Sequence, residues 1–81
     1  MNQFKQIKIK PEYYKAVLSG LKTFEIRKDD RNYQVGDTVC LNEWDGGDYT
    51  GRYTKVTITY VLRDVPEYGL MPGYCIFGWR Q

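Results

Sequence analysis

The chain has 81 residues, enough for one small domain, and we treat residues 1–81 as that single domain. Its net charge of +2 does not indicate bulk electrostatic binding of nucleic acid, although it allows a local basic patch. The sequence contains no histidine, which excludes Ser-His-Asp and Cys-His nucleophile systems and the common zinc sites. We therefore expect neither a metal nor a cofactor.

Two further features concern the cellular environment of the chain. Cys40 and Cys75 lie singly in apolar runs without a Cys-x-x-Cys pair, so we expect two buried free thiols, with a disulfide as the alternative. The amino terminus, Met1 to Lys5, lacks the apolar core of a signal peptide, and no run is long enough to span a membrane. The sequence therefore predicts a cytoplasmic protein with no membrane partner, and we expect it to be a monomer.

The first two predicted elements are a strand and a short helix. Gln3 to Lys10 alternates as a strand, with Ile7 and Ile9 on one face and lysines on the other. Those lysines suit either phosphate contact or the protection of an exposed sheet edge. Pro11 to Ser19 is predicted to be a helix that Gly20 ends in a left-handed conformation. The apolar face of this helix, which must dock on the sheet, comprises Tyr14, Val17, Leu18 and Leu21.

The segment after the helix is predicted to be a strand with two different faces. Phe24 and Ile26 fall on one face, which is apolar enough to be core, while Glu25 and Arg27 fall on the other. Lys22 stands at the mouth of this strand. A carboxylate beside cations forms either a solvated ladder of surface charges or a purpose-built site, and the pattern alone leaves both interpretations open.

Three later segments are predicted to be strands, and a loop separates the last two. The turn Val35-Gly36-Asp37 precedes the first of them, and its glycine supplies an unusual backbone conformation. Prolines and glycines mark Asp64 to Gly73 as the loop. The predicted strands are Thr38 to Trp44, Arg52 to Arg63 and Tyr74 to Trp79. Five short strands and one early helix predict a mainly β (α+β) fold, a small five- to six-stranded β-barrel that is closed or partly closed.

The charged strand also carries a known pattern. The stretch from Gly20 to Arg27 matches all four fixed positions of the Gly-x-Lys-x-x-Glu-x-Arg signature, so the chain resembles the ASCH domains of the PUA-like superfamily. The turn Val35-Gly36-Asp37 is similar to the second landmark of that family. The segment from Tyr68 to Tyr74 resembles a compact bacterial and phage PUA-like subgroup of unknown function. The resemblance implies a PUA-like β-barrel, a helix that flanks a cleft, and a domain that binds RNA.

In such a domain Lys22, Glu25 and Arg27 would line the binding cleft, with single-stranded RNA or a nucleotide as the partner. Arginine presents a planar fork that suits phosphate or a guanine edge, a carboxylate accepts from an exocyclic amine, and lysine holds phosphate. Aromatic side chains near the rim are candidates for stacking on an unpaired base, although each also suits the core of a small barrel. These candidates are Tyr13, Tyr33, Trp44, Tyr68 and Tyr74.

Two enzymatic functions and one non-enzymatic function are the alternatives. One ASCH branch hydrolyses N4-acetylcytidine with a lysine, a threonine nucleophile and a glutamate from a helical insertion. This sequence keeps Lys22, has Glu25 at the place of the threonine and lacks the insertion, so that activity is not expected. A ribonuclease would need Lys22 and Glu25 tuned for proton transfer, whereas neighbouring opposite charges favour their ionised forms. We therefore favour a binding module over an enzyme, with a protein-interaction module as the third alternative.

Overall fold

A computed structural model describes residues 3–80, and within that range it contains five strands, one α-helix and one short 3-10 helix. In chain order the elements are β1 (Phe4–Ile9), α1 (Pro11–Leu18), β2 (Phe24–Lys28), β3 (Thr38–Trp44), β4 (Tyr49–Arg63), η1 (Pro66–Tyr68) and β5 (Tyr74–Trp79). The mainly β fold class and the predicted bounds of β3 and β5 are confirmed, whereas β4 begins earlier than predicted. Neither helix in this range has the length and apolar character that crossing a membrane requires.

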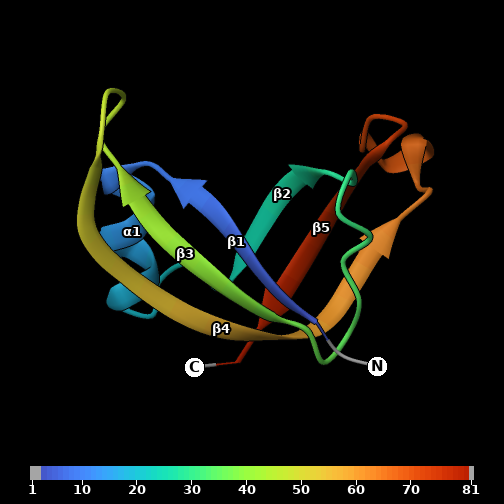
Figure 1. The fold of residues 1–81 in the computed structure, drawn as a ribbon. Helices are drawn as coiled ribbons and strands as arrows, with labels where there is room; N and C mark the ends of the chain where they lie inside the picture. The colour runs from blue at the N-terminus through green and yellow to red at the C-terminus, as the bar shows by residue number, and fades with distance from the viewer. Residues whose placement is uncertain (1–2, 81) are drawn as a thin grey trace.

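The strands form one sheet in the order β1-β3-β4-β5-β2, and the long strand β4 joins its two halves (Figure 1). β3 pairs with the first part of β4, from Tyr49 to Thr57, and β5 pairs with the second part, from Ile58 to Arg63. The register shifts between Ile58 and Tyr60, and an irregularity of this kind bends a strand. Among the described strands, β1 runs parallel to β3 and the other pairings are antiparallel.

The sheet does not close into the predicted barrel. β1 and β2 stand at the two ends of the strand order, so within residues 3–80 no ladder joins them. Arginine side chains cross this opening instead: Arg27 Nη2 donates to the Lys8 carbonyl, and Arg31 Nη1 donates to the Gln6 carbonyl at 2.7 Å. The two guanidinium groups therefore occupy backbone acceptors of β1 that face the opening, in place of the strand pairing that would complete a barrel.

The core lies where α1 and the two halves of the sheet meet. Tyr14 and Val17 are buried as predicted, but Leu18 and Leu21 are exposed. The helix ends at Leu18, so Leu21 lies in the turn after it and does not extend the buried face of the helix. The buried cluster comprises Ile7, Ile9, Tyr14, Val17, Tyr33, Val39, Leu41, Ile58, Cys75, Phe77 and Trp79.

Two local predictions about single residues are confirmed. Gly20 and Gly36 have φ angles of +80° and +95°, which an L side chain rarely adopts, and each stands at the turn where the sequence required a glycine. Cys40 and Cys75 are buried free thiols.

The two faces of β2 are the reverse of the prediction. Phe24 and Ile26 are 48% and 57% exposed, whereas Glu25 is only 5% exposed. The cause lies in the neighbouring strand, because directly opposed residues of an antiparallel pair place their side chains on the same face. Glu25 lies opposite Phe77, which is fully buried, so the charged face of β2 points inward. The interpretation of this strand as a solvated ladder of charges is therefore wrong.

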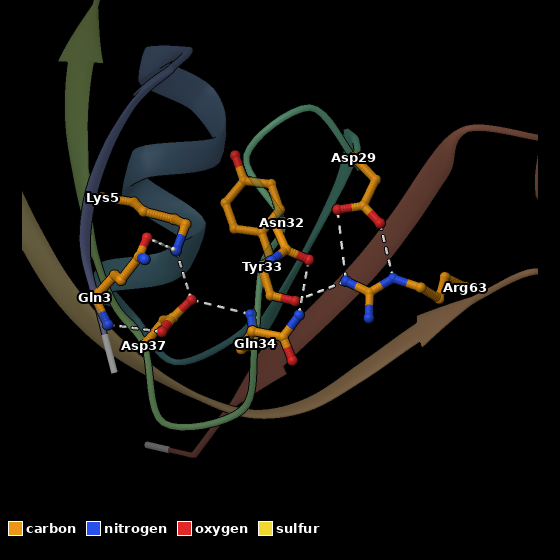
Figure 2. A network of polar contacts seen from close by, with 8 residues as sticks. All are labelled: Gln3, Lys5, Asp29, Asn32, Tyr33, Gln34, Asp37 and Arg63. Carbon is orange, nitrogen blue, oxygen red and sulfur yellow. Dashed lines mark hydrogen bonds and ion pairs between the residues drawn. The ribbon is translucent and has the colours of Figure 1, made fainter. Parts of the chain in front are cut away.

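Polar contacts anchor the segment between β2 and β3 at both of its ends (Figure 2). Near its start, Asp29 Oδ2 accepts from Arg63 Nε of β4 at 2.7 Å, and Arg63 Nη2 also donates to the Tyr33 carbonyl at 2.6 Å. At its end, Asp37 Oδ2 accepts from Lys5 Nζ of β1 at 2.6 Å. The segment is therefore tied to both halves of the sheet.

Candidate functional site

Glu25 lies at the centre of three charged side chains from β2 and the turn before it. Lys22 Nζ is paired with Glu25 Oε1, and Arg27 Nε donates to Glu25 Oε2 at 3.1 Å. The carboxylate is buried, whereas the Lys22 and Arg27 side chains are 17% and 29% exposed. We call these three residues the Glu25 cluster. The structure thus brings the three predicted signature residues together, with one carboxylate shared by two cations.

The turn after α1 determines the position of Lys22. The backbone N–H groups of Leu21 and Lys22 both donate to the Ala16 carbonyl at 3.0 Å, which fixes the chain as it leaves the helix. Lys22 Nζ then lies 4.8 Å from the ring centre of Tyr13 and 5.6 Å from that of Phe24. The ammonium group is therefore held by a carboxylate on one side and by the faces of aromatic rings on the other.

A hollow of about 700 Å³ lies beside this cluster, and Arg27 lines it. Five of the twelve basic residues of the chain line this hollow, but only one of its ten acidic residues, Asp30, does so. We call it the basic hollow; its lining is Gln6, Ile7, Lys8, Arg27, Lys28, Asp30, Arg31, Tyr33, Asn42, Tyr49, Gly51 and Arg52. Although the net charge of the chain is only +2, this local excess of positive charge attracts anions.

The basic side chains of the hollow differ in how far their charge is already neutralised. Arg27 is paired with Glu25, and Arg52 Nη2 lies 2.6 Å from Oε1 of the buried Glu43. Within residues 3–80, the three without an acidic partner in ion-pair distance are Lys8, Lys28 and Arg31. The positive charge available to a ligand therefore comes mainly from these three residues.

The aromatic side chains suggested for stacking do not gather in one place. Tyr33 belongs to the core at the base of the hollow: its ring centre lies 4.7 Å from that of Phe77, and burial raises the pKa of its hydroxyl. Tyr13 and Trp44 do not line the hollow, but each contacts a lysine. The two that neither line the hollow nor contact a lysine of the site are Tyr68 and Tyr74.

Several lining residues were not among the sequence-predicted candidates. The lysine row of the first strand was the only signal, and it pointed to Lys8 as a phosphate contact. The others lie far apart in the chain, and only the topology places the loop after β2 beside β1 and the β3–β4 hairpin. The residues that sequence reasoning missed include Lys28, Arg31, Asn42, Tyr49 and Arg52.

The fold and the Glu25 cluster define a small, mainly β domain with one helix and an inward-facing charged strand. The chain belongs to the family described as Domain of unknown function (DUF3850), which it matches over residues 4–79. It is also similar to a protein of Escherichia phage P2 named the uncharacterized 12.9 kDa protein in the GpA 3′ region. The two are 44% identical over 61 residues, which cover 75% of this chain and 56% of the phage protein. The chain thus spans little more than half the length of that relative.

Proposed function

We propose that this chain binds single-stranded RNA or a nucleotide in the basic hollow. The observation that carries the proposal is the gathering of basic side chains around one hollow, with Lys8, Lys28 and Arg31 lacking acidic partners within residues 3–80. Phosphate groups bind such clusters, and arginine forms short, charge-assisted hydrogen bonds with them. Single-stranded RNA also exposes bases that a hollow can receive, which duplex RNA does not.

The resemblance to ASCH domains supports the same proposal, and we propose that the chain is an ASCH domain of the PUA-like superfamily. The signature strand of those domains corresponds to β2, which carries Glu25 and Arg27. We assign Arg27 to ligand contact because it lines the basic hollow. We assign Glu25 to the positioning of Arg27, because Glu25 does not line the hollow and both of its oxygens are bonded to cations.

The proposal is for binding rather than for catalysis. General acid–base catalysis needs a group that is free to exchange a proton with the substrate. Both carboxylate oxygens of Glu25 are engaged, and Lys22 is held between Glu25 and Tyr13. The Glu25 cluster therefore offers neither of these two groups in the free state that a hydrolase or ribonuclease would require.

Charge reversal inside and outside the hollow tests the proposal. Arg31 lines the hollow, whereas Arg80 is exposed elsewhere, so Arg31→Glu and Arg80→Glu change the net charge equally. We expect Arg31→Glu to weaken the binding of a labelled single-stranded oligoribonucleotide about tenfold or more, and Arg80→Glu to have little effect. Fluorescence anisotropy at several salt concentrations measures both. Arg31→Ala should also lower the slope of log K against log salt by about 0.7.

Two outcomes would overturn this assignment. Equal losses in the two charge-reversal variants would show that binding follows net charge and not the hollow. No binding by the wild-type chain at low salt would refute RNA binding itself, and a protein-interaction module would then be the better interpretation.

A further inference from the structure

The basic hollow has two sides of different chemistry, which lie on the two sides of β1. On the side of β2, the charged residues that line the hollow are Arg27, Lys28, Asp30 and Arg31. Within residues 3–80, Lys28 and Arg31 have no acidic partner in ion-pair distance. On the side of β3 and β4, the lining is Asn42, Tyr49, Gly51 and Arg52. The charge of Arg52 is paired there with Glu43, whose Oε1 accepts from Arg52 Nε at 2.7 Å. Of the three unpaired cations that line the hollow, Lys28 and Arg31 therefore lie on the β2 side, and the third, Lys8, belongs to β1 itself.

An aromatic pair stands on the β4 side of the hollow. Tyr49 lies directly opposite Trp44 in the β3–β4 register, and Tyr49 is 58% exposed. Lys8 Nζ lies over both rings, at 4.5 Å from the centre of Trp44 and 5.8 Å from that of Tyr49. The ammonium group sits on a long flexible stem, so it can move aside and leave the face of the Tyr49 ring open to a planar ligand.

We propose that a single-stranded nucleotide chain crosses β1 with its phosphates on the β2 side and one base stacked on Tyr49. This assignment rests on the proposed function and specifies how its ligand lies. In the free protein Lys8 occupies the aromatic pair; on binding, the base replaces it and the ammonium group turns to a phosphate. Stacking on an aromatic ring is tolerant of base identity because every base has a π-face, so the site has little sequence preference.

A matched pair of tyrosines in β4 allows a direct test. Tyr53 has the same exposed fraction as Tyr49, 58%, but does not line the hollow. We expect Tyr49→Ala to weaken the binding of a single-stranded oligoribonucleotide about tenfold or more, and Tyr53→Ala to bind as the wild type does. Tyr49→Phe keeps the ring and should restore wild-type affinity. Thermal melts of all three variants control for loss of the fold.

The salt dependence and the ligand separate stacking from phosphate contact. Tyr49→Ala should leave the slope of log K against log salt unchanged, because it removes no charge. The wild type and Tyr49→Ala should bind an abasic sugar–phosphate chain equally, because this ligand has no base that could stack on Tyr49. A further loss in Tyr49→Ala with the abasic chain would refute the stacking role.

The failure of this inference differs from the failure of the proposed function. If Arg31→Glu abolishes binding while Tyr49→Ala and Tyr53→Ala both bind as the wild type does, the hollow holds phosphate but no base stacks on Tyr49. If the wild type does not bind, or if Arg31→Glu binds as well as Arg80→Glu, RNA binding in the hollow is itself wrong, and the stacking role is wrong with it.

Discussion

Asp37 and Glu25 are both buried carboxylates beside a lysine, but their surroundings differ. Asp37 is 1% exposed and accepts from Lys5 Nζ at 2.6 Å and from the backbone N–H groups of Gln3 and Gln34 at 2.8 and 3.0 Å (Figure 2). We call these four residues the Asp37 cluster. Its cation is buried as well, with the Lys5 side chain only 7% exposed. In the Glu25 cluster, by contrast, both cations are partly exposed, and one of them lines the basic hollow.

The difference shows how to separate a structural ion pair from a candidate site. Burying a charge costs several kcal/mol, and both clusters offset that cost with an opposite charge and further hydrogen bonds. In the Asp37 cluster the bonds from Gln3 and Lys5 tie the start of the chain to the loop before β3, and the bond from Gln34 holds that loop. Because the Lys5 ammonium group is buried, this cluster offers no charge to a ligand. In the Glu25 cluster the carboxylate leaves part of each cation in contact with solvent. The exposure of the cation, and not the burial of the carboxylate, therefore distinguishes a candidate binding site from a structural ion pair.

The largest expected effect is on the Asp37 cluster. Asp37→Ala leaves a buried ammonium group and two backbone donors without their acceptor, so we expect the free energy of unfolding to fall by about 3–5 kcal/mol. Urea denaturation measures this loss. Asp45→Ala is the control, because Asp45 also accepts from two backbone N–H groups but lies in an exposed turn, where water replaces the lost acceptor. Equal losses in the two variants would contradict a special role for the buried network.

A second prediction concerns how the Glu25 cluster acts. Glu25→Gln should lower the free energy of unfolding by about 1–3 kcal/mol, less than Asp37→Ala does, because water can still solvate the partly exposed cations. RNA affinity should also fall, since Arg27 loses an anchor. If Glu25 acts through Arg27, the two residues are coupled, by about 0.5–3 kcal/mol in a double-mutant cycle. Glu25→Gln should then change affinity no further in an Arg27→Ala background.

Additive effects of the two substitutions on RNA affinity would contradict a role of Glu25 through Arg27. They would mean that Glu25 contacts RNA itself, as the sequence alone suggested. Anisotropy titrations of the wild type and the three variants of the cycle, each checked for folding by a thermal melt, decide between the two roles.

Local patterns in the sequence were sufficient to predict most of the helix and strand positions, but not to predict which face of β2 points into the core. The bounds of β3 and β5 and the glycine after α1 have local causes, so these features were predicted correctly. The burial of Glu25 depends on Phe77, more than fifty residues later in the chain, which places the charged face of β2 inward. A strand with Phe24 and Ile26 on its other face gives no local sign of this. The apolar face was therefore assigned to the core, wrongly.

The same reasoning explains which part of the site was found. Lys22, Glu25 and Arg27 are close in sequence, and a signature that spans β2 and the turn before it identified them. Arg31 and Tyr49 meet around one hollow only because the chain places a loop and a hairpin on either side of β1. The sequence also did not predict the opening between β1 and β2. At this edge of β1 the partners are side chains of Arg27 and Arg31 and not another strand, and strand patterns alone do not reveal such contacts.

The smallest expected effect is the pH dependence of the Asp37 cluster. Burial favours the neutral carboxyl group, but the bonds from Lys5 and from the backbone of Gln3 and Gln34 outweigh it and hold the pKa of Asp37 below its usual 3.8. A carboxylate with a lowered pKa stabilises the fold fully above that usual value, and this contribution is lost as pH falls through the lower value in the folded state. We therefore expect the free energy of unfolding to decrease below about pH 4, by at most about 1.4 kcal/mol per pH unit for this one group. Bonds from Asp48 and Gly47 also lower the pKa of Asp45, so the wild type carries both contributions. Urea denaturation between pH 2 and 6 should therefore show a weaker acid dependence in Asp37→Asn than in the wild type, and an unchanged dependence would show that Asp37 is not the buried titrating group.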